Sequence, residues 1–481
     1  MLRITFCSLL FSLALSLFGD NGGYEITVKL TNFNEKAAYL ATYYGDKPYI
    51  QDTVAVNDQG TVVFKDIEPL PAGVYLVVIP PNNQFLQIFV DEHNQKFQMD
   101  VDVAKLAQND VKITGSPTNE LFYQYVQMLN ENSPKAQNLR TEITKLEEEG
   151  KDATTKRKEL DVLNKEVRTF QDDIIKKAPK SVLATWIKFG FEPEIPEFKG
   201  TDEEVQFKRY YHRKNHFFDW IDMGDPSLYH NPMLFKKVDY YLNTMTPPVP
   251  DSIIVSLDKI LKLIQPGEKT FEFYLRDFLN KYATDATKIV GMDAVYVHLV
   301  ENYYSKGLAP WVDEEQLTKI RTEAARMKPT LIGRKAPNIK MTKEDGSKIA
   351  LYDLDADYTV IFFWRPGCSH CKKATPHILE FQEKYKDKVK VMATCIKLGD
   401  EADECWKFVK EKEMEPLLNV FDPTNSSRFY TKYDTRITPR VFILDKDKKI
   451  LINRIGAEQL GEVMDQIIKQ DNQELQKEIK K

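Results

Sequence analysis

The stretch from residue 359 to residue 373 constrains the fold of this 481-residue chain more than any other part of it. Residues 360–364 form an unbroken apolar run of β-branched and aromatic side chains, which predicts a buried strand. The Arg-Pro-Gly sequence at 365–367 breaks that strand, and a helical pattern opens at Cys368 and Cys371. The sequence therefore predicts a central strand that turns directly into a helix carrying two thiols on its first turn.

Two cysteines in this position are suited to redox chemistry. The partial positive charge of a helix N-terminus favours the thiolate form of Cys368. The two intervening residues allow Cys371 to reach back and close a disulfide with it. The alternatives are a structural bridge or half of a zinc site, but zinc requires a second ligand pair, and Cys395 and Cys405 lie ten residues apart. We predict a redox-active pair, with no metal and no cofactor.

Composition narrows the class of protein further. Apolar residues make up 42% of the chain and charged residues 29%, which is typical of a soluble globular protein of two to four domains. The net charge of −5 mixes both signs, so nothing points to nucleic acid as a partner. Apart from Cys7, all the cysteines lie in the last quarter of the chain, which is not the spread of a fold held together by disulfides.

Residues 1–19 read as a secretory signal, with Arg3 before an apolar run at 4–18 that is short for a membrane span. Cys7 has no room before it for a lipoprotein-type apolar segment, so we expect no lipid anchor. No later segment is long and apolar enough to cross a bilayer. The mature protein is expected to be secreted, and soluble or peripheral.

The rest of the chain divides by pattern. Short alternating strands with Asn, Asp, Gly and Pro between them predict a small β-sandwich over 24–115. An all-α domain follows over 116–330, where Thr118 is the expected first cap. It includes a charged helical hairpin that is interrupted near Gly150. The last domain is expected over 331–471, with a charged tail at 472–481.

His212 and His216 stand four residues apart on a predicted helix at 203–219, which is a metal-ligand spacing. The glutamate of an HExxH motif is absent, since position 213 is Arg. Aromatic neighbours surround both histidines in the sequence. We therefore expect packing here, and no metal.

The last domain follows an α/β order. A hairpin at 338–351 precedes strand 358–364, helix 368–386, strand 389–396, helix 402–412 and strand 417–421. Helix 425–433, strands 440–445 and 449–454, and helix 457–470 complete it.

This domain resembles the thioredoxin fold, and within it the secreted TlpA/ResA-like branch. The resemblance rests on the strand ending at Trp364, the Cys368–Ser369–His370–Cys371 motif, Pro376 in the helix, and Thr438–Pro439 before the next strand. It implies that Cys368 attacks substrate disulfides and Cys371 resolves the mixed disulfide. It also implies a cis Pro439 that places Thr438 against the sulfurs, and a helix kinked at Pro376.

Three features depart from that family, one of which is the Arg365–Pro366 lead-in before Gly367, where a small or aromatic residue is usual. Thioredoxins carry a buried Asp six residues before the first cysteine, where this chain has Phe362. Many ResA-like proteins carry a Glu three residues after the second cysteine, where this chain has Ala374. Neither expected proton acceptor for Cys371 is present, so water or a group from another domain would have to serve.

Three further residues bear on the chemistry. A His between the cysteines also occurs in disulfide oxidases and isomerases of this fold. His370 can stabilise the Cys368 thiolate, which lowers the pKa of that thiol and makes the disulfide more oxidising; the alternative is an exposed His with little effect. Cys395 and Cys405 are expected either to form a second disulfide, which an oxidising compartment favours, or to remain two buried thiols.

These features together predict a secreted thiol–disulfide oxidoreductase. The upstream segments look like those that precede thioredoxin modules in secreted Bacteroidota proteins, and this resemblance implies the periplasm of a Gram-negative bacterium. The expected partners are substrate proteins with cysteines or disulfides, and an unidentified thiol–disulfide electron donor. Two alternatives stay open: a disulfide oxidase or isomerase, suggested by His370, and a non-catalytic binding protein that uses the fold as a scaffold. A peroxidase is disfavoured, because Arg365 stands where such enzymes carry a Thr.

Overall fold

The computed structural model describes residues 22–283 and 289–479, so the expected signal sequence lies outside the described residues. The chain forms two compact units. One comprises the residues up to Met245 together with Lys262–Phe271, and the other comprises Thr246–Leu261 and Glu272 onward. Helices α6 (Pro250–Ile264) and α7 (Glu268–Lys281) contribute residues to both units.

The first unit begins with two four-stranded sheets. Alternating side chains such as Ile26, Val28 and Val77 point inward from both sheets and share one core. The predicted all-β fold at the N-terminus is confirmed. One sheet has the order β4-β1-β7-β8 and the other β3-β2-β5-β6. The strands are β1 (Glu25–Thr31), β2 (Ala37–Tyr44), β3 (Lys47–Ala55), β4 (Thr61–Lys65), β5 (Gly73–Ile79), β6 (Gln84–Val90), β7 (Lys96–Asp102) and β8 (Val111–Thr114).

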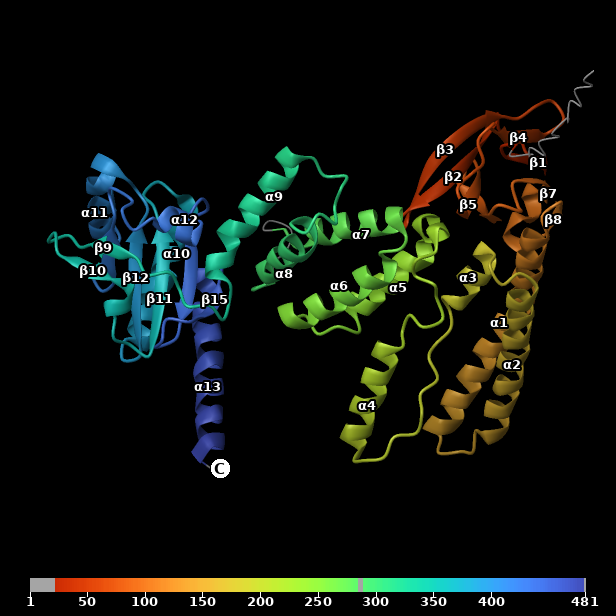
Figure 1. Ribbon diagram of the computed structural model, residues 1–481. Helices are drawn as coiled ribbons and strands as arrows, with labels where there is room; N and C mark the ends of the chain where they lie inside the picture. The colour runs from red at the N-terminus through yellow and green to blue at the C-terminus, as the bar shows by residue number, and fades with distance from the viewer. Residues whose placement is uncertain (1–21, 284–288, 480–481) are drawn as a thin grey trace, which may run out of the picture. The chain divides into compact units, whose positions relative to one another are not determined.

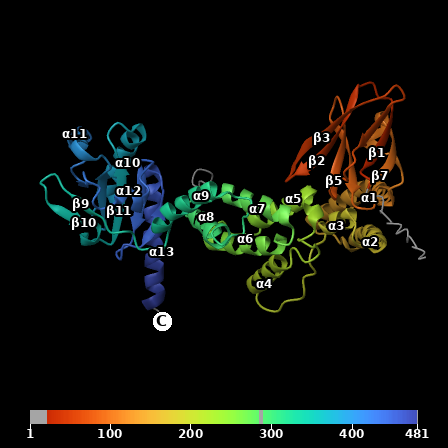
Figure 2. The same ribbon diagram turned by 45° about the horizontal axis from the view of Figure 1, so that its top comes forward.

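Helices follow the sheets, as predicted. The charged hairpin consists of α1 (Pro117–Glu148) and α2 (Thr154–Lys177), which lie side by side in Figures 1 and 2. The remaining helices are α3 (Val182–Lys188), α4 (Asp202–Asn215), a short 3-10 helix (Pro226–His230), α5 (Pro232–Asn243), α8 (Asp293–Leu299), a π-helical turn (Val300–Tyr304) and α9 (Glu314–Met327).

The cap of α1 differs from the prediction. Ser116 is the N-cap, and its Oγ accepts a hydrogen bond of 3.3 Å from the backbone N–H of Asn119. Pro117 holds the first helical position, which its fixed φ favours, so the residue before it makes the cap. Thr118 is instead buried inside the first turn and accepts a hydrogen bond from Asn94 Nδ2 at 3.1 Å.

A seven-stranded mixed sheet organises the C-terminal part of the second unit. Its order is β10-β9-β13-β12-β11-β14-β15, and Figure 1 shows β11 and β12 side by side at its centre. β11 pairs in parallel with β12 and antiparallel with β14. The predicted thioredoxin-like α/β fold is confirmed. The strands are β9 (Lys340–Thr342), β10 (Lys348–Ala350), β11 (Tyr358–Trp364), β12 (Val389–Cys395), β13 (Leu418–Phe421), β14 (Arg440–Leu444) and β15 (Ile450–Asn453).

Helices cover both faces of this sheet. Val360 and Phe362 of β11 face a core completed by α10 (Ser369–Tyr385), α11 (Ala402–Glu411) and α13 (Leu460–Ile479). Ile361 and Phe363 face the opposite core, which includes the short helix α12 (Phe429–Tyr433). Every residue of β11 is buried, as an unbroken apolar strand between two helical layers should be.

Several helix boundaries depart from the prediction, among them the end of α4, which comes at Asn215 instead of residue 219 and leaves His216 as the C-cap. α12 begins four residues later than expected, because Asn425 and Arg428 take left-handed backbone conformations at φ 51° and 58°. The carboxylate of Asp422 accepts a hydrogen bond of 2.7 Å from the N–H of Ser427, which holds this loop instead. α13 continues to Ile479, well past residue 470, through a sequence rich in the helix formers Gln, Glu and Lys.

Candidate active site

The two thiols lie where β11 passes into α10. β11 ends at Trp364, and the turn that follows uses Gly367 at a φ of 78°, a conformation that glycine adopts without steric penalty. Cys368 is the N-cap of α10, and its Sγ accepts a hydrogen bond of 3.2 Å from the backbone N–H of Cys371. A sulfur in that place faces the positive end of the helix dipole.

Cys368 is the more accessible thiol. It is half-buried, and its Sγ lies 3.5 Å from the carbonyl oxygen of Thr438 and 3.7 Å from Thr438 Oγ1. Burial alone would raise the pKa of the Cys368 thiol. Hydrogen bonds from the Cys371 thiol and backbone N–H, and from the Thr438 hydroxyl, outweigh burial and lower that pKa below its ordinary value. The site therefore enriches the thiolate of Cys368.

Cys371 has the opposite environment. Its side chain is fully buried, and burial raises the pKa of its thiol to about 12, with a further contribution from its hydrogen bond to Cys368. Both cysteines are free thiols in this structure. One thiol is therefore accessible and easily ionised, while its neighbour is enclosed and protonated.

The loop before β14 brings Thr438 to the sulfurs from 70 residues further along the chain. The peptide bond between Thr438 and Pro439 is cis, as the resemblance implies. Ile437, just before it, leaves 57% of its surface exposed beside the thiols.

The other predicted site residues are divided between core and surface. Trp364 is only 1% exposed and stacks on Phe408 with ring centroids 4.9 Å apart, so it supports the site from beneath without reaching solvent. Pro376 lies inside α10 on its exposed side, and the neighbouring Thr375 donates a hydrogen bond of 2.9 Å to the carbonyl of Cys371. His370 is exposed in the first turn of α10.

The two positions where the family carries carboxylates are apolar in the folded chain. Phe362 and Ala374 are both buried in the same core cluster as Cys371. The groups that hydrogen-bond to Cys371 include the Cys368 thiol, the backbone of Arg365 and the hydroxyl of Thr438.

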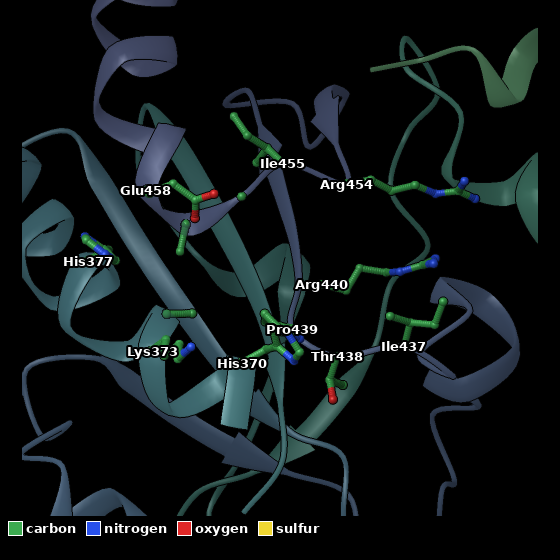
Figure 3. A pocket seen from close by; sticks show the side chains of 13 residues that line it. His370, Lys373, His377, Ile437, Thr438, Pro439, Arg440, Arg454, Ile455 and Glu458 are labelled. Atoms are coloured by element: carbon green, nitrogen blue, oxygen red, sulfur yellow. The ribbon is translucent and has the colours of Figure 1, made fainter. Parts of the chain in front are cut away.

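A hollow of about 700 Å³ opens beside the thiols. Figure 3 shows it between the first half of α10, the Thr438–Pro439 loop and the segment that follows β15. Sequence patterns single out few of its residues, because they come from three separate segments. The lining comprises His370, Lys373, Ala374, His377, Ile437, Thr438, Pro439, Arg440, Arg454, Ile455, Gly456, Ala457 and Glu458.

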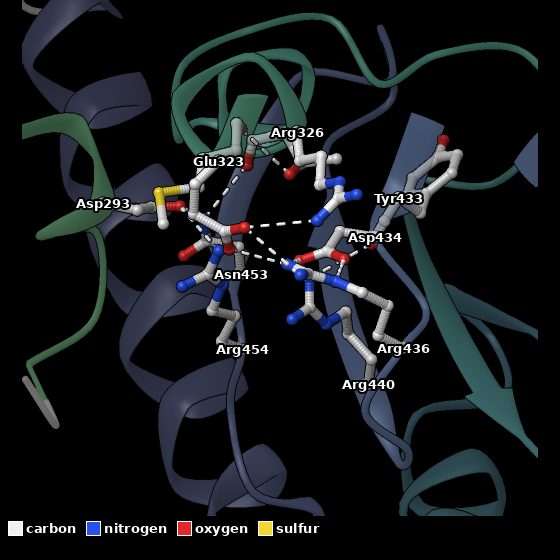
Figure 4. Close-up of polar contacts among 11 residues, drawn as sticks. Asp293, Glu323, Arg326, Tyr433, Asp434, Arg436, Arg440, Asn453 and Arg454 are labelled. Carbon is white, nitrogen blue, oxygen red and sulfur yellow. Dashed lines mark hydrogen bonds and ion pairs between the residues drawn. The ribbon is translucent and has the colours of Figure 1, made fainter. Parts of the chain in front are cut away.

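Two arginines of this lining lead to a polar network behind the hollow (Figure 4). Arg440 is 5% exposed, and its Nη1 lies 3.5 Å from Asp434 Oδ2 and donates to the carbonyl of Tyr433 at 3.2 Å. Burial lowers the pKa of Arg440 to about 10, so the guanidinium stays charged at neutral pH. Arg454 Nη2 lies 3.7 Å from Asp293 Oδ2 on α8.

The same network ties α8 and α9 to the thioredoxin-like sheet. Arg436 donates to Glu323 of α9 at 2.6 and 3.2 Å, and it also bonds the carboxylate of Asp434. Asn453 Nδ2 donates to Asp293 at 2.9 Å and to the carbonyl of Thr330 at 3.0 Å. Sequence reasoning missed this network, since its charges lie on segments more than 100 residues apart.

The other two cysteines are joined. Cys395 at the end of β12 and Cys405 in α11 form a disulfide with their Cα atoms 6.2 Å apart, and both are buried. The bridge closes the connection between these two elements.

His212 and His216 lie close together without a metal-binding set. Their ring centroids are 4.3 Å apart, His212 Nε2 contacts the carbonyl of Glu194 at 2.9 Å, and His216 Nδ1 contacts Asp219 at 2.6 Å. Within the described residues, no three His, Cys, Asp or Glu side chains gather as metal ligands would. In that same part of the chain, no helix has the length and apolar character needed to cross a membrane.

Comparisons with known proteins agree with this geometry. Residues 332–452 match the AhpC/TSA family, and residues 24–122 and 125–329 match two domains of unknown function, DUF4369 and DUF5106. Thiol-disulfide oxidoreductase ResA of Bacillus thuringiensis subsp. konkukian is 31% identical over 140 residues, which are 29% of this chain and 77% of the relative. ResA of Bacillus anthracis is 31% identical over 129 residues, or 26% and 71% of the two chains.

Solved structures show similar matches. A domain of a possible thiol-disulfide isomerase from Cytophaga hutchinsonii is 37% identical and covers 30% of this chain and 97% of its own, with a TM-score of 0.27. A thioredoxin-like protein from Bacteroides caccae is 20% identical and covers 57% and 96%, with a TM-score of 0.42.

The C-terminal fold with its two thiols defines a thiol–disulfide oxidoreductase of the thioredoxin-like class. More narrowly, the chain belongs to the ResA family of these enzymes, with two further domains preceding the shared module.

Proposed function

We propose that this protein exchanges thiols and disulfides with cysteines of other proteins through Cys368 and Cys371, in the periplasm of a Gram-negative bacterium. The observation that carries the proposal is the contrast between the two thiols. Cys368 is accessible and has a lowered pKa, whereas Cys371 is buried with a pKa of about 12. Nucleophilic attack requires the thiolate, so the first step belongs to Cys368.

In the reductive direction, the Cys368 thiolate attacks one sulfur of a substrate disulfide. A mixed disulfide forms, and the other substrate sulfur leaves as a thiolate that takes up a proton. Cys371 then loses its proton and attacks Cys368 Sγ, which releases the second substrate thiolate and leaves the Cys368–Cys371 disulfide. Two electrons pass to the substrate, and a dithiol electron donor must return them. The oxidative direction reverses the same steps.

The buried thiol becomes easier to ionise at the moment it is needed. Burial is the main cause of its high pKa, and the hydrogen bond and negative charge of Cys368 add to it. Once Cys368 is held in a mixed disulfide, its negative charge is gone. The pKa of Cys371 should therefore fall before the second step, although Phe362 and Ala374 supply no carboxylate as proton acceptor.

Trapping tests the proposal directly. In Cys371→Ser the mixed disulfide cannot be resolved, so Cys368 should hold substrate proteins as adducts that a reductant releases. The matched control is Cys368→Ser, which removes the accessible thiol and keeps only the buried thiol of Cys371. Adducts are counted on non-reducing gels after expression in the periplasm. Equal adduct levels in the two variants would contradict the assigned roles, and a lack of any adduct would contradict protein cysteines as substrates.

A net oxidase is the second candidate, and the lowered pKa of Cys368 favours it. Hydrogen bonds that stabilise the thiolate stabilise the reduced protein, which makes the disulfide a stronger oxidant. The reduction potential of the Cys368–Cys371 pair decides between the directions. A value near that of thioredoxin, about −270 mV, would exclude the oxidase, while a value near −120 mV would support it.

A further inference from the structure

The wall of the hollow formed by α10 carries the cation Lys373 near Cys368, with a histidine on either side of it along the helix. His370, Lys373 and His377 stand at intervals of three and four residues, so they share one face of the helix. All three are exposed, and within the described residues no hydrogen bond or ion pair engages their side chains. The N-terminal end of α10 adds the positive end of its dipole to the same wall.

The two arginines of the lining do not present their positive charge to a molecule in the hollow. Figure 3 shows the guanidinium groups of Arg440 and Arg454 pointing away from the hollow, and both face carboxylates of the network behind it. Their charges are thus largely compensated from behind. The charge available to a molecule in the hollow is that of the α10 wall.

The remaining surface of the hollow is mostly apolar. Ile437, Pro439 and Ile455 contribute to it, and Glu458 is the one acidic side chain among the described lining residues. An extended peptide laid across Thr438 would therefore meet apolar side chains on one side and a cationic helix face on the other. Apolar contact favours binding, and the cationic face selects the charge of what binds.

We propose that this hollow selects protein segments that carry an acidic side chain two to four residues from the substrate's reactive cysteine. Lys373 is the main residue that pairs with this acidic side chain. The proposal rests on the proposed function. The spacing follows from geometry: Lys373 and His377 lie five and nine residues beyond Cys368, which is roughly 7 to 14 Å along a helix axis. An extended peptide spans that distance in roughly two to four residues.

The test uses the reduced full-length protein and short synthetic peptides closed by an internal disulfide. One peptide carries Glu three residues from the reactive cysteine, and the others carry Gln or Lys there. A fourth carries Glu eight residues away. The second-order rate of peptide reduction is measured for each. Reduction of the peptide disulfide oxidises Cys368 and Cys371, so no other reductant takes part.

We expect the near-Glu peptide to react about fivefold faster than the Gln peptide, the upper range for one exposed ion pair. The advantage should disappear for the far-Glu peptide and shrink with added salt. Lys373→Glu should abolish or invert it. Lys372→Glu is the matched control, because Lys372 is the exposed neighbour on the same helix and lies outside the lining.

The outcomes separate the two proposals. If the wild type reduces the Glu and Gln peptides at equal rates, or if both lysine variants lose the preference alike, the charge selection is wrong and thiol–disulfide exchange stands. If the reduced wild type reduces none of the peptides and the oxidised wild type oxidises none of their dithiol forms, the proposed function fails and the selection fails with it.

Discussion

The hydroxyl of Thr438 donates to Cys368 Sγ at 3.7 Å and helps to lower the pKa of that thiol. Thr438→Val keeps the shape of the side chain and removes the donor, so the pKa of Cys368 should rise. Alkylation of Cys368 below its pKa should slow by roughly two- to tenfold, the range for one hydrogen bond of about 0.5–1.5 kcal/mol. The alkylation rate measured against pH reports the change, because Cys371 is buried and protonated.

Thr435→Val is the control for this experiment. Thr435 is fully buried a few residues earlier in the same loop, and within the described residues its hydroxyl has no hydrogen-bond partner. It should leave the pH profile unchanged. A Thr438→Val profile that coincides with that of the wild type would show that the hydroxyl does not act on the thiolate.

At the scale of single residues, the sequence identifies what a local motif carries. Cys368 and Cys371 could be predicted because their spacing, and the strand before them, lie within 15 consecutive residues. Lys373 and Arg454 could not, because their meaning depends on a hollow built from three segments. The burial of Trp364 was predictable from the same apolar run, but its stacking on Phe408 was not, because Phe408 lies on a helix more than 40 residues further along the chain.

At the scale of elements, the disulfide between Cys395 and Cys405 ties β12 to α11. Replacing both cysteines with Ala should lower the free energy of unfolding by roughly 3 kcal/mol, the chain-entropy value for a loop of about ten residues. Denaturant unfolding under non-reducing conditions measures the loss. The comparison is made in a Cys368→Ala/Cys371→Ala background, so that oxidation of that pair does not contribute. Equal midpoints with and without Cys395 and Cys405 would refute a stabilising bridge.

Elements with one dominant signal were predictable to within a residue or two. β11 is an unbroken apolar run, and its observed bounds are those predicted. The start of α12 was not predictable to this accuracy, because the side-chain bonds of Asp422 and two left-handed residues replace the expected first turn. The cap of α1 shows the same limit: Ser116 and Thr118 are both good caps, and Pro117 decides between them.

At the scale of the whole molecule, the polar network makes the helices α8 and α9 part of one unit with the thioredoxin-like sheet. The network extends to the hollow beside the thiols, because Arg440 and Arg454 belong to the network and also line the hollow. The helical segment therefore does more than precede the catalytic module in sequence. It supplies carboxylates, Asp293 and Glu323, that hold the rear of the site.

Asp434 is the centre of this network and gives its sharpest test. It is 2% exposed and faces Arg436 and the buried Arg440. Asp434→Asn would leave the Arg440 charge buried without its partner, which should destabilise the unit by roughly 3–5 kcal/mol. Glu323→Gln weakens only the more exposed pairs with Arg436 and Arg326 and should change stability by about 0–1 kcal/mol. Thermal or denaturant unfolding of the full chain compares the two, and equally small effects would refute the central role of Asp434.

The pH dependence of the stability of Asp434→Asn tests whether the ionised Asp434 carboxylate is what stabilises the fold. Burial alone would raise the pKa of Asp434, but its bonds to Arg436 and the charge of Arg440 outweigh burial and lower it below the ordinary value for Asp. A carboxyl with a depressed pKa in the folded state stabilises the fold above its unfolded-state pKa, and that contribution is lost as the pH falls through the folded-state value. The difference in free energy of unfolding between wild type and Asp434→Asn should therefore be largest at neutral pH and shrink only below about pH 4. A gap that is constant from neutral to acidic pH would show that the substitution acts through packing and not through the ionised carboxylate.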